Sequence, residues 1–200
     1  MMKKGLGVSA IVVMCLSVPA LSLADSTTFV VRDDGKSKVT FVSDAPLDTM
    51  TGNSSKVTGS VTVDPADISK ATGSFEVPVV SLRTGNELRD EHLRGDGWVD
   101  AKNNPTIYFK ITEVVLGKKA PRELKKNKDT KVQVRGTFTT HGISRPVTAN
   151  GTVNWSDKLL RIKASFTFEL ENHQISVPSI VRLKVANEIA VSVDLLAVAQ

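Results

Sequence analysis

The chain has 200 residues, of which 40% are hydrophobic and 24% charged, and its formal net charge is +5. Its single cysteine, Cys15, lies in an amino-terminal apolar run, so the rest of the chain can form no disulfide, thiolate metal site or cysteine nucleophile. Without Lys3 and Lys4 the balance of basic and acidic residues falls from 26 − 21 = +5 to 24 − 21 = +3, which does not indicate a nucleic-acid partner.

The amino terminus has the pattern of a secretory signal peptide. Two lysines precede an apolar run from Val8 to Leu23, and Ser22-Leu23-Ala24 supplies the small residues that signal peptidase reads. We expect cleavage near Ala24, which divides the chain into a signal peptide, residues 1–24, and one domain, residues 25–200. The alternative is a membrane anchor, for which the run is short and interrupted by Pro19.

The first half of the domain alternates apolar and polar residues, which predicts β-strands. From Phe29 onward, a run at 39–41 leads through Pro46 and a Thr-Gly-Asn turn to a pairing run at 57–63. A turn at 64–67 precedes a strand at 73–79, in which Pro78 indicates an edge or a bulge.

Alternation stops between Ser81 and Phe109, where charged residues and glycines cluster. We expect a crossover with a few helical turns that begins near Thr84-Gly85-Asn86 and is limited by later glycines and a proline. Such a segment would act as a lid or plug on the sheet. Within it, Arg89 and Asp90 are predicted to form a structural ion pair, and the alternative is polar contact with a ligand head group.

Alternation resumes after the crossover. Strands are expected at 106–111, at 132–138 paired with 147–155 across a link at 140–146, at 160–170 after a turn at 154–158, and from about 181 to 196. The polar segment between the strands at 106–111 and 132–138 carries the largest basic cluster. We favour a solvated hairpin loop for this segment over a site that binds an anionic surface. The members of the cluster are Lys118, Lys119, Arg122, Lys125, Lys126, Lys128 and Lys131.

About eight strands with regular turns predict a single antiparallel all-β domain, and closure into an eight-stranded barrel removes both exposed edges. Such a barrel is filled by side chains or holds one apolar ligand. Many inward positions are small or slender, which favours a pocket over a solid core. They are Val39, Gly59, Val61, Gly136, Ala149, Gly151, Val153 and Ala164.

Three motifs carry a resemblance to a known family: SL-x-TG-x-x-x-RD-x-HL at the crossover, RGTFTTHGISRPV after it and the closing ENHQISVP…VANEIAVSVDL. Together they resemble the YceI-like family of exported lipid-binding proteins over roughly Phe29 to Ala197. The resemblance implies a lipocalin-like barrel in the periplasm that holds a long isoprenoid or fatty-acyl chain without catalysis. The family usually has a His-Ser pair on its first strand, where this chain has Lys36-Ser37, so a head-group contact there is in question.

The expected lipid tunnel is lined by alternating apolar residues and closed by three residues of the crossover. Its walls would be Phe41, Val61, Phe75, Val77, Phe109, Phe138, Val153 and Phe166, and its lid Leu88, Leu93 and Trp98. Arg89, Asp90 and His92 are the candidate head-group or lid contacts. The only ligand expected is the lipid, with no other cofactor, and a homodimer is compatible with the sequence.

The three histidines, His92, His141 and His173, lie on separate predicted elements, so neither a metal site nor a catalytic base with its nucleophile is expected. Two other functions remain open. One is an enzyme acting on an isoprenoid or acyl lipid in the same pocket, and the other is a solid-cored scaffold for a protein partner.

Overall fold

The structure, a computed structural model, describes residues 26–117 and 120–200. The signal-peptide prediction therefore lies outside the described residues. Within them the chain forms ten strands in one sheet and a single α-helix, α1 (Glu87–Arg94). The strands are β1 (Thr27–Val31), β2 (Lys38–Ala45), β3 (Asp48–Ser54), β4 (Thr58–Val63), β5 (Thr72–Pro78), β6 (Thr106–Val115), β7 (Asp129–Thr140), β8 (Ile143–Trp155), β9 (Leu159–Glu169) and β10 (Glu188–Ala199).

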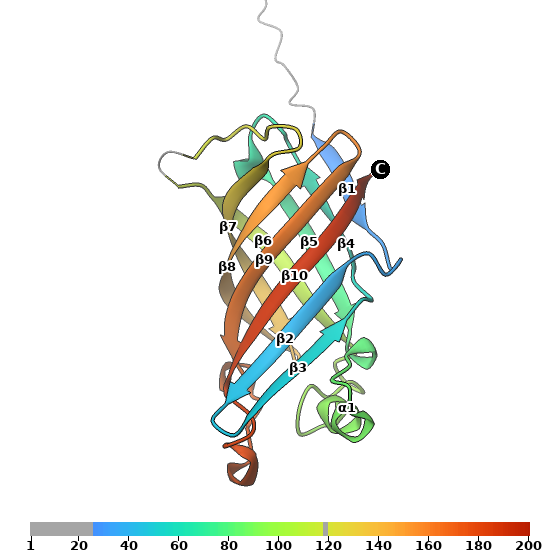
Figure 1. Ribbon diagram of the computed structural model, residues 1–200, viewed down its shortest axis with the longest axis vertical. Coiled ribbons are helices and arrows are strands. Elements are labelled where there is room, and N and C mark those ends of the chain that lie inside the picture. The colour runs from blue at the N-terminus through green and yellow to red at the C-terminus, as the bar shows by residue number, and fades with distance from the viewer. Residues whose placement is uncertain (1–25, 118–119) are drawn as a thin grey trace, which may run out of the picture.

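Eight of these strands close a barrel, as the sequence predicts (Figure 1). The strand order is β1-β4-β5-β6-β7-β8-β9-β10, and β10 pairs back with β1 from Ala197 to Ala199. All pairings between named strands are antiparallel. The remaining two strands form the β2–β3 hairpin, which attaches to β10 beside β1.

Strand β10 changes partner along its length, and a buried serine completes the junction. Residues 189–194 pair with β2, whereas residues 197–199 pair with β1. Between these two stretches the Leu196 N–H donates to the Oγ of Ser37, at 3.0 Å. Ser37 is 1% exposed, so its hydroxyl replaces a ladder hydrogen bond that neither strand supplies.

Four of the expected local structures are wrong in detail. Residues 46–53 are not only a turn, because most of them belong to β3, which pairs with β2. The 57–63 run, which forms β4, pairs with β1 and β5 and not with the 39–41 run. Strand β3 contains one apolar residue, Met50, so alternation could not reveal it. The last strand begins at Glu188, since 179–181 form a 3₁₀ turn after Pro178. The β7–β8 link is only His141-Gly142, both with positive φ, as in a tight two-residue hairpin.

The crossover contains the short helix that the sequence predicts. Asn86 caps the amino end of α1, with its side chain accepting a hydrogen bond from the Arg89 N–H at 3.0 Å. Gly95 ends the helix after eight residues, and the chain then turns through Trp98 toward Pro105 and β6. Figure 1 shows α1 outside the barrel wall, near the end that carries the β2–β3 turn.

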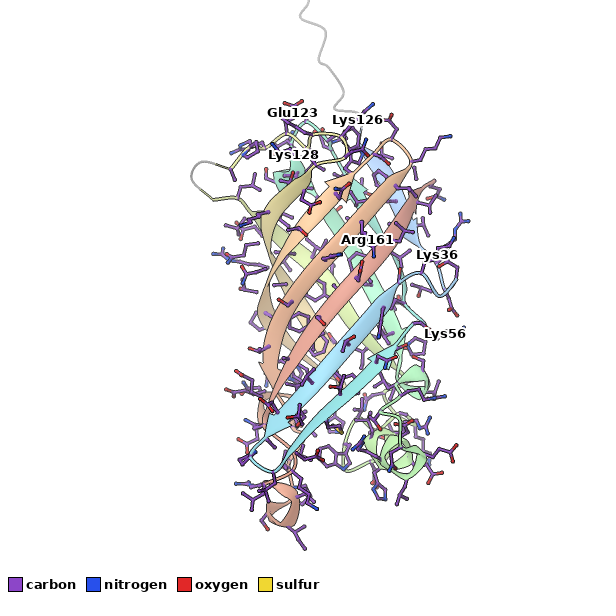
Figure 2. All side chains as sticks on the ribbon, in the orientation of Figure 1. Lys36, Lys56, Glu123, Lys126, Lys128 and Arg161 are labelled. Carbon is purple, nitrogen blue, oxygen red and sulfur yellow. The ribbon has the colours of Figure 1, made fainter. Side chains whose placement is uncertain are left out.

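The opposite end is closed by the loop between β6 and β7. Backbone bonds join it to the turn after β4, with Ile68 N–H donating to Arg122 O at 2.9 Å and Leu124 N–H to Pro65 O at 2.8 Å. Described members of the basic cluster in this hairpin loop, Lys126 and Lys128 among them, point outward from the upper end in Figure 2, while Lys118 and Lys119 lie outside the described residues.

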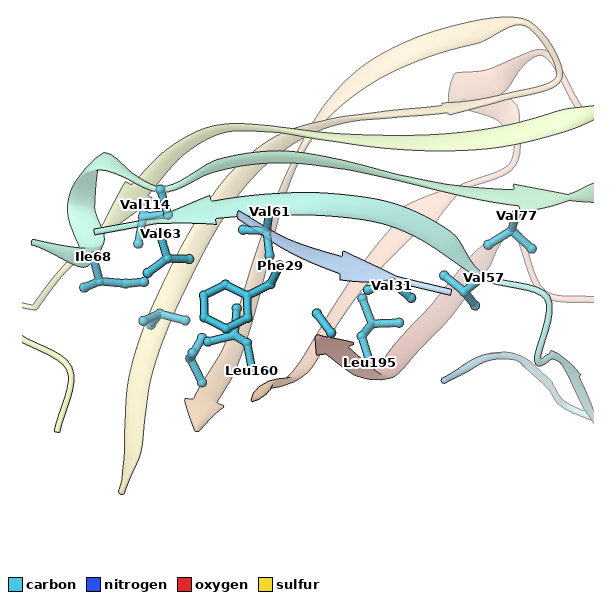
Figure 3. Close-up of a cluster of buried hydrophobic side chains, with 14 of the residues drawn as sticks. Phe29, Val31, Val57, Val61, Val63, Ile68, Val77, Val114, Leu160 and Leu195 are labelled. Carbon is cyan, nitrogen blue, oxygen red and sulfur yellow. The ribbon is translucent and has the colours of Figure 1, made fainter. Parts of the chain in front are cut away.

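The core follows from strand alternation, which turns every second side chain inward. Figure 3 shows one cluster of buried side chains from six strands and the turns next to β4. Phe29 in this cluster is fully buried. The labelled residues are Phe29, Val31, Val57, Val61, Val63, Ile68, Val77, Val114, Leu160 and Leu195. These side chains are buried and pack against one another, and all of them except Phe29 and Val31 also line the first cavity described below.

Glycines opposite aromatic residues give the aromatic rings their room. A Cβ placed on Gly136 would collide with the Phe109 ring and lie 2.8 Å from the Lys110 carbonyl oxygen. We expect Gly136→Ala to lower the free energy of unfolding by about 1–3 kcal/mol, since the added methyl forces strand or ring to shift. Thermal or urea unfolding measures this. Gly97→Ala, where a Cβ meets nothing within 4 Å, is the matched control and should change stability little; equal stability of both variants would contradict the packing role.

Candidate functional site: an apolar interior in two cavities

The barrel interior contains a first cavity of about 130 Å³ along strands β4 to β10. Phe75, Phe109 and Phe166 contribute rings to its wall, and Val61 and Val153 contribute slender side chains. Tyr108 and Lys163 are the polar residues in this lining. All the other residues that line the cavity are apolar. The space therefore suits a hydrocarbon rather than a charged molecule.

A second cavity, of about 100 Å³, lies toward the end that carries α1. Leu93, Trp98 and Val99 wall it on the crossover side, and Ile175 and Val185 wall it from the segment between β9 and β10. Thr140 is its polar residue. The crossover thus forms one side of this cavity, as a lid would, and its role as a lid stays a prediction.

Five residues belong to the lining of both cavities and so separate them: Val39, Val77, Ile107, Phe138 and Val191. We call these five residues the partition, and Phe138 has the largest side chain among them. Its ring lies 5.2 Å from that of Phe166 and 4.8 Å from that of Phe168. A cavity of ~150 Å³ takes up benzene, so each space alone suits a short stretch of carbon chain, and a longer chain requires the partition residues to move apart.

Most of the sequence-predicted tunnel residues lie in these linings. The first cavity contains Val61, Phe75, Val77, Phe109, Phe138, Val153 and Phe166, and the second contains Phe41, Val77, Leu93, Trp98 and Phe138. Leu88 is placed wrongly by the sequence prediction, since its side chain is 62% exposed and lines neither cavity. Helical geometry explains this, because Leu88 projects from a different face of α1 than Leu93.

The crossover is fixed by a buried carboxylate whose partner is a threonine. Asp90 is 4% exposed, and its Oδ1 accepts hydrogen bonds from the Thr84 N–H at 2.7 Å and the Thr84 hydroxyl at 2.6 Å. Burial on its own raises the pKa of Asp90. The two hydrogen bonds from Thr84, with the charges of Arg83 and Arg94, outweigh burial and hold the pKa below its ordinary value of 3.8.

The predicted Arg89–Asp90 ion pair is therefore wrong. Arg89 donates instead to the Thr84 hydroxyl at 3.0 Å and to the Thr84 carbonyl at 2.9 Å. Adjacent residues on a helix point in different directions, so both side chains reach the loop before α1 but not each other. Arg89, Asp90 and the exposed His92 all lie outside the linings of the two cavities.

Sequence reasoning missed the wall contributed by two segments. Met50 lies in β3, which has no alternation, and Ile175 and Val185 lie in the loop before β10. The only available signal was apolar spacing in 175–185, and it resembled the start of a strand. The wall of the second cavity thus depends on tertiary contacts rather than on a strand pattern.

The histidines do not form a metal site. His92 is exposed on α1, whereas His141 Nδ1 lies 3.0 Å from the carbonyl oxygen of His173, so these two are neighbours. The His173 ring is 1% exposed and stacks edge-on against Phe138 and Phe168. In residues 26–117 and 120–200 no three His, Cys, Asp or Glu side chains meet in a way that could hold a metal ion.

The Lys36-Ser37 pair does not face the cavities. Lys36 is exposed and its Nζ lies 3.2 Å from Asp34 Oδ2, outside the barrel, as Figure 2 shows. Ser37 serves the β10 junction described above. Among the described helices, moreover, none has the length and hydropathy needed to span a bilayer.

The fold and its interior define a class: a closed antiparallel β-barrel with an apolar, internally divided cavity. The YceI-like domain family matches residues 31–197, and the chain belongs to this family.

Relatives of the same family share moderate sequence identity. A UPF0312 protein of Vibrio cholerae is 27% identical over 132 residues, covering 63% of this chain and 65% of the relative. A UPF0312 protein of Pseudomonas aeruginosa is 27% identical over 125 residues, covering 60% of each chain. The matched part of this chain thus spans less than two thirds of the length of these relatives.

Two solved structures have the same fold. BcnA of Burkholderia cenocepacia gives a TM-score of 0.70 at 22% identity, covering 83% of this chain and 98% of that one. A polyisoprenoid binding domain from Saccharophagus degradans gives 0.66 at 15% identity, covering 87% and 99%. At these identities the likeness establishes the fold.

Proposed function

We propose that the protein is a periplasmic carrier that holds one long-chain lipid, a polyisoprenoid or a similar hydrocarbon, inside the barrel. The observation that carries the proposal is the pair of apolar cavities divided only by the side chains of the partition. The description of one structural neighbour as a polyisoprenoid binding domain supports the choice of lipid, and the predicted signal peptide supports export.

Burial of the tail supplies the binding free energy. Each methylene group removed from water contributes roughly 0.8 kcal/mol, so a tail that fills both cavities binds tightly even after the cost of ordering it. The linings contain few polar groups, so the tail rather than the head group dominates recognition. A carrier also requires no catalytic pair, which agrees with the absence of titratable side chains other than Tyr108 and Lys163 from the two linings.

Organic extraction of the purified protein followed by mass spectrometry tests this function. We expect about one equivalent of a long-chain lipid per protein, and affinity for added prenyl alcohols that rises with tail length. A folded protein that retains no lipid, and that binds neither short nor long tails, would identify the interior as a packed core. An enzyme would instead release a chemically altered lipid on incubation.

A further inference from the structure

Large apolar side chains are exposed mostly at one end of the barrel. Among the described residues, five of the seven lie in α1 and the loops at the end that carries the β2–β3 turn, Tyr108 lies on the barrel wall near the start of β6, and Leu159 lies at the opposite end. The five are Leu47, Val80, Leu88, Ile180 and Leu183. Single exposed apolar residues are common on proteins, but a concentration at one end marks an interaction surface.

Three of these residues form what we call the apolar tip: Leu47, Ile180 and Leu183. They are 68%, 90% and 58% exposed. The Leu47 N–H donates to the Leu183 carbonyl at 2.9 Å, which joins the β2–β3 turn to the loop before β10. Ile180 and Leu183 are three residues apart in consecutive tight turns, so their side chains lie on one side of the loop.

Cationic side chains flank the tip. Arg182 and Lys184 are both exposed and alternate with Ile180, Leu183 and the half-buried Val185. Arg182 Nε donates to the Val177 carbonyl at 3.3 Å, and its Nη2 lies 4.0 Å from the Glu171 carboxylate, a loose surface contact. The Arg182 side chain is nevertheless 64% exposed, so the guanidinium is accessible. Apolar side chains interleaved with lysine and arginine are typical of segments that enter the interface of a bilayer.

The tip is continuous with the wall of the second cavity. Met50 lies three residues after Leu47, Val185 lies two residues after Leu183, and both line that cavity. Figure 1 shows the loop before β10 projecting beyond the end of the barrel, so the tip can reach a surface that the barrel itself does not touch.

We propose that the apolar tip docks this end of the barrel on a phospholipid bilayer, and that lipid passes between the bilayer and the second cavity there. The transfer step rests on the proposed carrier function. A bilayer fits better than a second copy of the chain, because a two-fold contact through the tip would bring Arg182 and Lys184 close to their own copies.

Co-sedimentation with vesicles tests the proposal, using phosphatidylcholine alone and phosphatidylcholine mixed with phosphatidylglycerol. The double variant Ile180→Ser/Leu183→Ser should bind both vesicle types at least about tenfold more weakly than the wild type, since burying each side chain contributes more than the equivalent of a tenfold change. Leu159→Ser, which removes an exposed leucine at the opposite end, is the matched control and should bind like the wild type. Arg182→Glu/Lys184→Glu should lose binding mainly to the anionic vesicles.

Several results would overturn the docking proposal: no vesicle binding by the wild type, equal binding by the double variant, or an equal loss in Leu159→Ser. Self-association that disappears in the double variant would make the tip a dimer contact instead. Retained lipid and binding of a detergent-solubilised prenyl alcohol are measured on the same proteins. They should be unchanged in the tip variants, so loss of carrier function and loss of docking are distinguishable.

Discussion

Replacing Asp90 with alanine should lower the free energy of unfolding by about 3 kcal/mol. The change removes a carboxylate that accepts two short hydrogen bonds from Thr84 and leaves the buried Thr84 N–H without a partner. Hydrogen bonds to a charged group contribute about 1.5–3 kcal/mol each, and a buried unsatisfied donor costs about 1–3 kcal/mol. Urea unfolding of wild type and variant measures the difference.

Arg89→Ala is the matched control, because Arg89 contacts the same threonine from a half-buried position. Its side chain is half-exposed, so water can replace its two hydrogen bonds to Thr84, and its loss should cost about 1 kcal/mol, less than the loss of Asp90. If Arg89→Ala were as damaging as Asp90→Ala, the Arg89 hydrogen bonds to Thr84 would hold the crossover as strongly as the Asp90 carboxylate does. If neither variant changed stability, the crossover would be held by the apolar contacts of Leu93 and Val99 alone.

The pH dependence of stability provides a second measure of the Asp90 contact. Its folded-state pKa is lowered, so the ionised carboxylate stabilises the folded protein above pH 3.8, and this stabilisation is lost as the pH falls through the folded-state value. The stability difference between the wild type and Asp90→Asn should therefore be constant near neutral pH and shrink below about pH 4. A difference that does not shrink as the pH falls below about 4 would contradict this origin.

The sequence predicts the barrel well because β-strand alternation is a local property. Strands such as β9, where Ile162, Ala164, Phe166 and Phe168 share a face, carry their inward side in the amino-acid order. Many residues that line the first cavity, such as Val61, Phe75 and Phe109, lie on such strands. The resemblance at the crossover adds the family, which alternation alone could not indicate.

The second cavity could not be predicted to the same extent. Its wall includes Met50 from an edge strand without alternation and Val185 from an irregular loop. The Arg89–Asp90 prediction failed because the sequence places charges next to each other, whereas the direction of helical side chains decides their partners. The prediction that Leu88 closes the cavity failed for the same reason. Long-range contacts, such as Ser37 with Leu196, have no local signature at all.

Replacing Val153 with tryptophan should shorten the lipid tail that the protein accepts. Val153 is buried in the wall of the first cavity and lines only that one, so an indole ring there occupies space that the distal part of a long tail would use. Loss of room for about three methylenes costs roughly 2.4 kcal/mol, which is a decrease of about fiftyfold in affinity for long tails. Short tails, held in the second cavity, should bind nearly as before.

Val30→Trp is the matched control, because Val30 lies on β1 between the inward-facing Phe29 and Val31 and so faces outward. It introduces the same ring without entering either cavity and should leave both affinities unchanged. Fluorescence displacement with prenyl alcohols of increasing length measures the affinities, and thermal unfolding confirms that each variant is folded. The two cavities act as one continuous tail site only if Val153→Trp discriminates by length. Equal loss for short and long tails would show that short tails also occupy the first cavity, and unchanged binding of long tails would show that the tail does not enter the first cavity.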